Sequence, residues 1–200
     1  MKNMKILLKV LLIIVSFSLF SCKPKRAIAT QEIVPKRDKI AEIIDFAAQS
    51  WDSISKKIPS GMEETFGFND LEEIKNSSFG MPIRMYYWQN NEMIESYTFR
   101  VPIIVNEKMV SLLTVSAENE MTTGDFGASL LAQNIQLISD YYNVTIIGIL
   151  RVHSITTDFL IFEDINISYF IPVLPSVLQN LSQRNILTIK DISTIIPNDQ

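Results

Sequence analysis

The 200-residue sequence contains one cysteine, one histidine and six glycines. A zinc site needs three or four nitrogen or sulfur ligands, and a disulfide needs two cysteines, so the sequence lacks the residues for either. The glycine-rich phosphate-binding patterns GxxxxGK[ST] and GxGxxG do not occur, nor does the GxSxG pattern that presents a nucleophilic serine. We therefore expect no metal, no cofactor and no catalytic residue that a motif would identify.

The single cysteine, Cys22, follows a segment with the pattern of a secretory signal. Lys2, Lys5 and Lys9 precede an apolar run from Val10 to Phe20. A positively charged start followed by roughly 7–15 apolar residues is typical of such signals. The run is shorter than the roughly 20 residues that a membrane-spanning helix needs, so we expect a cleaved signal and no transmembrane anchor.

The residues before Cys22 resemble the lipobox of bacterial lipoproteins. A small residue, Ser21, directly precedes the cysteine, and Leu19 stands three positions before it. The resemblance implies that residues 1–21 are a lipoprotein signal peptide, that the Cys22 thiol carries acyl chains, and that these chains hold the protein to a membrane of the bacterial cell envelope. Two or more acyl chains anchor a protein stably, whereas one binds only marginally. Lys23 is not the aspartate that commonly retains lipoproteins at the inner membrane, so the outer membrane is favoured.

Charge is divided unevenly along the rest of the chain. Without residues 1–21, which hold three lysines and no acidic residue, 15 basic and 22 acidic residues remain, a net charge of −7. Residues 22–39 hold six basic and two acidic residues, and we interpret residues 22–37 as a flexible basic tether suited to anionic lipid headgroups. The remainder holds nine basic and 20 acidic residues, which argues against binding to nucleic acid.

Residues 38–200 are expected to form a single α+β domain. We predict an antiparallel sheet of about five to six strands with helices packed on it, because the strands are clustered and do not alternate with helices. This element order is similar to that of profilin-like and PAS-like domains. The expected helices are residues 38–58, 70–75, 126–142, 176–183 and 189–196, and the expected strands are residues 83–88, 97–105, 108–116, 144–153 and 157–163, with 167–171 as an extension.

Local signals specify several details of these elements. Asp38 and Asp125 are expected to cap the helices that follow them, and Thr188 with Asp191 predicts a capping box. A two-residue loop at 106–107 predicts a hairpin with Val101 opposite Leu112, Ile103 opposite Val110 and Arg100 opposite Leu113. Pro102 predicts an edge strand or a bulge, because proline lacks an N–H group.

Arg151, His153 and Asp158 form the first candidate site. Residues two apart on a strand share a face, and a loop of about four residues would place Asp158 opposite His153. Such a trio could bind an anion or act as acid and base near neutral pH. The alternative, a solvated hairpin end with a local salt bridge, is the commoner origin of such a group.

Aromatic residues form the second candidate site, within the region Tyr86–Phe99. Tyr86 and Trp88 share one face of a strand, and Tyr97 lies on the next strand. If exposed, these side chains would make a recognition surface, because tyrosine and tryptophan are enriched at interfaces. The alternative is packing in the core and at a sheet edge, which we consider the more common outcome.

The leading hypothesis is a non-enzymatic, lipid-anchored binding or assembly module that contacts an envelope protein, peptide or glycan. Two alternatives stay open. One is a hydrolase or transferase that uses carboxylates with His153, and the other is an inhibitor or pro-domain-like partner of an exported enzyme. The missing catalytic motifs favour binding over catalysis.

Overall fold

The computed structural model describes residues 37–173 and 185–196, which belong to one compact unit and have an α+β fold. The predicted class is confirmed, and the predicted helix at 176–183 lies outside the described residues. The elements are α2 (Arg37–Ser55), η1 (Glu63–Phe66), α3 (Leu71–Lys75), β1 (Ser78–Phe79), β2 (Ile83–Gln89), β3 (Glu92–Val105), β4 (Lys108–Ser116), β5 (Thr122–Gly127), α4 (Ser129–Tyr142), β6 (Gly148–Val152), η2 (His153–Ile155), β7 (Thr157–Asp164), β8 (Ile167–Pro172), β9 (Leu187–Thr188) and α5 (Ile189–Ile195).

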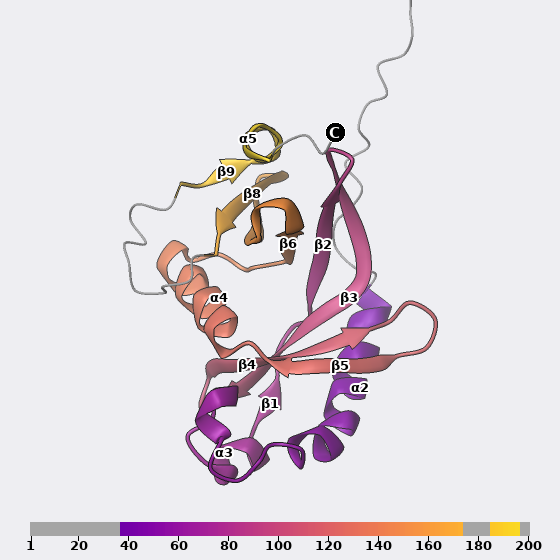
Figure 1. Ribbon diagram of the computed structural model, residues 1–200, viewed down its shortest axis with the longest axis vertical. Coiled ribbons are helices and arrows are strands. Elements are labelled where there is room, and N and C mark those ends of the chain that lie inside the picture. The colour runs from indigo at the N-terminus through magenta and orange to yellow at the C-terminus, as the bar shows by residue number, and fades with distance from the viewer. Residues whose placement is uncertain (1–36, 174–184, 197–200) are drawn as a thin grey trace, which may run out of the picture. The chain divides into compact units, whose positions relative to one another are not determined.

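The nine strands of the described residues form one sheet in the order β5-β4-β3-β2-β6-β7-β8-β9, with β1 paired to β3 (Figure 1). All pairs are antiparallel except β2 and β6, which are parallel. The prediction of five to six antiparallel strands is therefore wrong in size and in the direction of one pair. The chain passes from β5 at one edge through α4 to β6 in the middle of the sheet, and this crossover produces the parallel pair.

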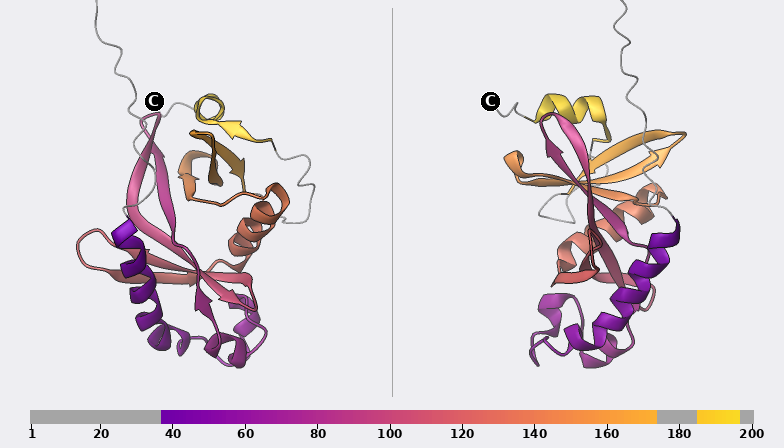
Figure 2. Two further views of the ribbon diagram at one scale, coloured as in Figure 1. Left: turned by 180° about the vertical axis from the view of Figure 1, so that it is seen from behind. Right: turned by 90° about the vertical axis from the view of Figure 1, so that its right-hand side faces the viewer.

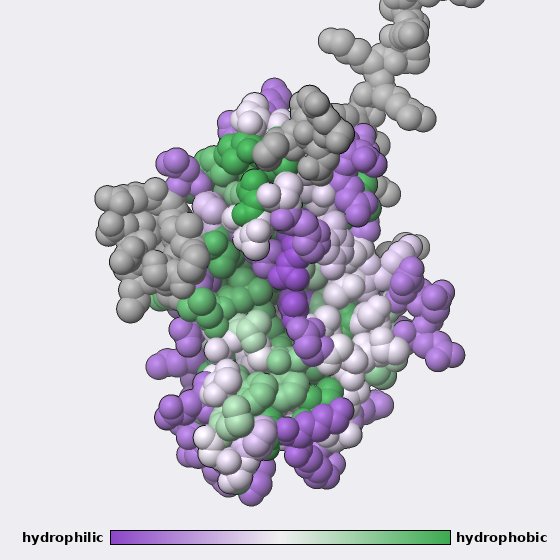
Figure 3. Space-filling model, in the orientation of Figure 1, coloured by the Kyte–Doolittle hydropathy of each residue, from purple (hydrophilic) through white to green (hydrophobic). Residues whose placement is uncertain are grey.

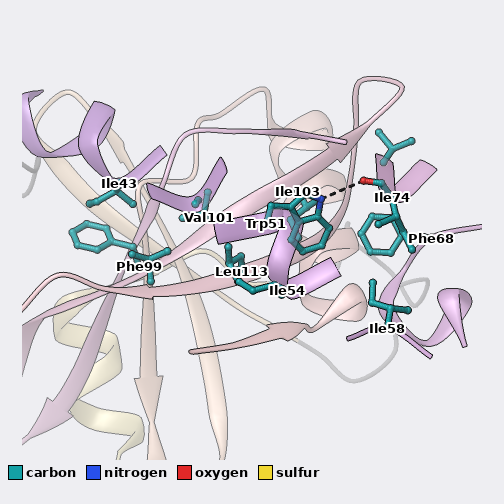
Figure 4. Close-up of a cluster of buried hydrophobic side chains, with 13 residues drawn as sticks. Ile43, Trp51, Ile54, Ile58, Phe68, Ile74, Phe99, Val101, Ile103 and Leu113 are labelled. Atoms are coloured by element: carbon teal, nitrogen blue, oxygen red, sulfur yellow. Dashed lines mark hydrogen bonds between the residues drawn. The ribbon is translucent and has the colours of Figure 1, made fainter. Parts of the chain in front are cut away.

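Helix α2 covers one face of the sheet, which we call the α2 face. Its predicted apolar stripe is buried against β3 and β4, with Trp51 near the centre of the cluster (Figure 4). The Trp51 indole packs against the rings of Phe68, Phe79 and Phe126, and its Nε1 donates a hydrogen bond to the Ile74 carbonyl at 3.2 Å. The helix starts at Arg37, so Asp38 lies in its first turn and not at the predicted cap position.

Helix α4 lies on the opposite side of the sheet, which we call the α4 face (Figures 1 and 2). Ala132, Ile135 and Ile138 of α4 are buried in a second cluster with residues of β2, β4, β6, β7 and β8. The predicted start of this helix at Phe126 is wrong, because residues 122–127 pair with β4 as strand β5. Asp125 is consequently a strand residue and not a helix cap.

The β3–β4 hairpin has the predicted turn but a shifted register. Asn106 and Glu107 both have positive φ, as a two-residue hairpin loop requires. A bulge opposite Ile103 and Ile104 leaves Val110 of β4 as the extra residue, which places Val101 opposite Leu113 and Arg100 opposite Thr114, one position from the prediction. Pro102 precedes this bulge in an interior strand, between the parts of β3 that pair with β2 and with β1.

The C-terminal part of the described chain follows the predictions more closely. Strand β8 corresponds to the predicted extension at 167–171 and pairs with both β7 and β9. Thr188 and Asp191 form the predicted capping box at the start of α5. Within residues 37–173 and 185–196, no helix has the length and apolarity needed to cross a membrane.

Candidate functional site on the α4 face

The alternation of side chains along β2 divides the predicted aromatic site between the two faces of the sheet. Arg84, Tyr86 and Trp88 point to the α2 face, since the Arg84 guanidinium lies 4.9 Å from the ring centre of Phe99. Tyr86 is 3% exposed and Trp88 is 9% exposed, so neither contributes to an exposed recognition surface. Burial raises the pKa of Tyr86 to about 12. Tyr97, by contrast, is 55% exposed.

The residues of the other candidate site lie on the α4 face, but in a different pairing from the one predicted. Arg151 lies directly opposite Asp158, and His153 has no partner on β7, because the strand ends at Val152 and a short helical turn, η2, follows it. Arg151 Nε donates to Asp158 Oδ1 at 2.9 Å and Nη2 donates to Oδ2 at 2.8 Å. This hydrogen bonding raises the pKa of Arg151. The two planar groups thus form a forked ion pair of the stronger kind.

The imidazole of His153 stacks on the ring of Tyr87, with ring centres 5.8 Å apart and planes 7° from parallel. Tyr87 on β2 is the direct neighbour of Arg151 on β6. Both oxygens of the Asp158 carboxylate accept hydrogen bonds from Arg151, so Asp158 holds the guanidinium and does not orient the imidazole. The trio is therefore not arranged as an acid–base pair.

Three further polar residues, which the sequence did not reveal, extend this group across β3, β4 and β5. Arg100 donates a hydrogen bond to the Thr114 hydroxyl, and its Nη1 lies 3.6 Å from Asp125 Oδ1. The Thr114 hydroxyl in turn donates to Asp125 Oδ1 at 2.7 Å. The Arg100 side chain is only 10% exposed, whereas that of Asp125 is 77% exposed.

The electrostatics of Asp125 connect the two groups. Its pKa is lowered, mainly by the hydrogen bond from Thr114. Desolvation opposes this effect, and the positive charge of Arg100 and, least of all, that of Arg151 add to the lowering. Arg151 in turn has its pKa raised partly by the charge of Asp125. Two guanidinium groups from strands on either side of β2 therefore act on the same exposed carboxylate.

We call the set Arg100, Thr114, Asp125, Arg151 and Asp158 the arginine–aspartate cluster. Its strands run from β5 through β4 and β3, across β2, to β6 and β7. In the view of Figure 3 a strongly hydrophilic strip runs down the middle of the molecule, beside hydrophobic side chains around α4. The Tyr87–His153 stack borders the cluster on the side of Arg151.

Arg84 is a second buried arginine, and it lies on the α2 face, whereas Arg100 lies on the α4 face. It pairs with Glu95 and lies over the ring of Phe99. Desolvation by burial lowers its pKa. In the described structure the Nε atoms of Arg84 and Arg100 are buried and make no hydrogen bond. The two arginines are thus similar in burial but differ in face and surroundings.

No family model, no curated protein and no solved structure matches the chain. In the part of the chain that the structure describes, no group of three or more histidine, cysteine, aspartate or glutamate side chains could hold a metal ion.

Proposed function

We propose that the protein is a lipoprotein of the bacterial cell envelope, anchored through acyl chains on Cys22, with a non-enzymatic binding module as its domain. The sequence Leu19–Cys22 supports the anchor, and the absence of aspartate at position 23 favours the outer membrane. The partner is an envelope protein, peptide or glycan. The profilin-like or PAS-like element order stays a prediction.

The observation that carries the binding role is the combination of the Arg151–Asp158 fork with the Tyr87–His153 stack. Both pairs are planar and held by a specific contact, and the imidazole and part of the guanidinium face solvent. Side chains already fixed in position lose less conformational entropy when a partner binds. Tyrosine and arginine are also the residue types that most often dominate binding energy at interfaces.

The alternative of a hydrolase or transferase is less well supported. Asp158 is committed to Arg151, and the lowered pKa of Asp125 keeps its carboxyl group ionised near neutral pH, so it holds no proton to donate as a general acid. The second alternative, an inhibitor or pro-domain-like partner of an exported enzyme, is itself a binding role and would use the same face.

The anchor limits where the partner can lie. Fifteen peptide units separate Cys22 from the first described residue, Arg37, and a chain spans at most roughly 3.3–3.6 Å per residue. Arg37, where the described domain begins, therefore lies at most roughly 50–54 Å from Cys22, whatever the conformation of the tether. A membrane protein, or a structure close to the membrane, is the expected partner.

Cross-linking and capture from native membranes test this proposal. The wild-type chain should capture a defined partner. The double variant Arg151→Gln/Asp158→Asn replaces both charged side chains by neutral amides, and the amount of partner that it captures should be about tenfold lower. Lys56→Ala, which breaks an exposed ion pair with Asp52 of α2, is the matched control and should capture as the wild type does. The Cys22→Ala variant, which lacks the proposed acylation site, should no longer be found in the membrane fraction. Equal capture by the double variant would contradict binding at this face.

A further inference from the structure

We propose that Tyr87, Arg151, His153 and Asp158 bind an uncharged sugar ring of an envelope glycan. The inference rests on the proposed binding function of the α4 face and names the ligand class of that same site. Arg100 and Asp125, whose strands lie on the other side of β2 from Arg151, take no part in it.

The four side chains form one contiguous group. Tyr87 on β2 is the direct neighbour of Arg151 on β6, and Arg151 is the direct neighbour of Asp158 on β7. His153 belongs to the group because its imidazole stacks on the Tyr87 ring. Neighbouring strands lie about 4.8 Å apart, so the strands of Tyr87 and Asp158 are about 10 Å apart. One short ligand therefore reaches both the ring stack and the fork.

The ring stack supplies flat apolar surface. The planes of the two rings lie 7° from parallel, the imidazole is exposed, and Ile94 of β3, directly opposite Tyr87, is 41% exposed. A sugar ring carries C–H groups on its flat faces, and placing such a face on an aromatic ring removes weakly polar surface of both from water. The part of the group around Tyr87 is therefore suited to one face of a sugar ring.

The fork supplies hydrogen-bonding groups that its own contact leaves over. Arg151 uses two of the five N–H groups of a guanidinium to bind Asp158, which leaves three. Each carboxylate oxygen of Asp158 accepts one of these hydrogen bonds and keeps the capacity for another. The Arg151 side chain is 33% exposed and that of Asp158 is 17% exposed. Adjacent sugar hydroxyl groups both donate and accept, so they match a donor and an acceptor held side by side.

The charge of the site favours an uncharged ligand over an anion or a cation. The two charges of the fork balance each other, so neither requires a counter-ion from a ligand. Residues from 40 onward carry nine basic and 20 acidic side chains, and this excess of negative charge repels an anion. A cation stacked on His153 would lie close to the Arg151 guanidinium and be repelled by it. A neutral ring with several hydroxyl groups avoids both repulsions.

Four probes test the inference with the untagged full chain in micelles of a detergent without sugar groups: methyl glucoside, sorbitol, methyl glucuronide and glucosamine. His153 is the only histidine of the sequence, so its imidazole C–H signals report binding by NMR without further assignment. We expect methyl glucoside to shift these signals with a Kd of about 1 mM. Sorbitol, which has hydroxyl groups but no ring, should bind about tenfold more weakly, and the anionic glucuronide and cationic glucosamine at least about threefold more weakly.

Variants separate the ring stack from the fork. His153→Ala should bind methyl glucoside about fivefold more weakly, whereas His153→Phe, which keeps a flat ring, should stay within about twofold of the wild type. Arg151→Gln/Asp158→Asn should bind about tenfold more weakly, because hydrogen bonds to charged groups are lost. Tyr97→Ala, which removes a 55% exposed ring of β3 outside the group, is the matched control and should bind as the wild type does.

Two further measurements make the variants comparable. In the His153 variants, transfer of saturation from the protein to the glucoside protons replaces the imidazole signals as the measure of binding. Circular dichroism verifies that each variant is folded, and the retained binding of His153→Phe distinguishes a lost contact from a general disturbance of the site.

Several outcomes would overturn the inference: no binding of methyl glucoside at about 100 mM, equal affinities for methyl glucoside and sorbitol, tighter binding of either charged sugar, or unchanged affinity in His153→Ala and in the double variant. The failure of the proposed function is a different result. Capture of a membrane partner that depends on Arg151 and Asp158 but is unaffected by methyl glucoside would refute only the sugar ligand. Cleavage of methyl glucoside by the chain would refute only the non-enzymatic role and leave the sugar site in place.

Discussion

Replacement of Trp51 by alanine is expected to lower the free energy of unfolding by about 3–5 kcal/mol. The indole is buried at the centre of the α2-face cluster and contacts three phenylalanine rings. Its removal leaves a cavity between α2, the segment after it and β5, which the backbone cannot close without moving strands. Denaturant unfolding of the wild type and the variant measures the difference.

Trp51→Phe and Trp88→Phe form a matched pair for the contribution of the hydrogen bond. Both indoles are buried, but Trp51 Nε1 donates to the Ile74 carbonyl, whereas Trp88 Nε1 makes no hydrogen bond in the described structure. Phenylalanine at 51 would lose this hydrogen bond, at a cost of about 0.5–1.5 kcal/mol beyond the lost packing, while the Ile74 carbonyl keeps the hydrogen bond from the Ser77 hydroxyl. Trp88→Phe should lower the free energy of unfolding by less than Trp51→Phe. An equal or larger loss for Trp88→Phe would contradict a stabilising role of the Trp51 hydrogen bond.

Gly67→Ala is expected to destabilise the domain by about 2–4 kcal/mol, the sum of backbone strain and overpacking. Gly67 has φ of 96°, in the region that favours glycine. A Cβ atom there would lie 2.1 Å from the Val110 carbonyl oxygen and 3.0 Å from Ser129 Cβ. The oxygen belongs to the backbone of β4, so it cannot move aside as the end of a flexible side chain could.

Gly61→Ala is the control for the conformational part of this effect. Gly61 has a similar φ of 84°, but a Cβ there would meet no atom within 4 Å. Its loss should be about 1–2 kcal/mol, the usual strain of a left-handed residue, or roughly 2–8 °C in Tm for a domain of this size. Equal shifts for the two variants would show that Gly67 is not in close contact with β4.

Local sequence signals predicted the elements whose cause is local. The three-and-four spacing of apolar residues predicted α2, a two-residue loop predicted the β3–β4 turn, and Thr188 with Asp191 predicted the start of α5. In each case neighbouring residues determine the structure. The predicted burial of the α2 stripe followed from the same periodicity.

Features that depend on distant partners could not be predicted in this way. The parallel β2–β6 pair depends on where α4 returns the chain, and the bulge at Val110 of β4 shifted the register of the β3–β4 hairpin by one residue. Asp125 is of a residue type that is common at helix N-caps, but residues 122–127 pair with β4 as strand β5, so the helix begins after them. The cluster was missed for the same reason, because Arg100, Thr114 and Asp125 come from three strands that meet only in the folded sheet.

The most direct test of the central claim is the intact mass of the native protein purified from membranes. We predict a chain that begins at Cys22 and carries a diacylglyceryl group on that cysteine, with or without a third acyl chain on the new amino terminus. Lipase treatment should remove the ester-linked mass. An unmodified chain of 22.8 kDa, the mass of all 200 residues, would contradict the lipoprotein assignment and with it the proposed location of the binding module.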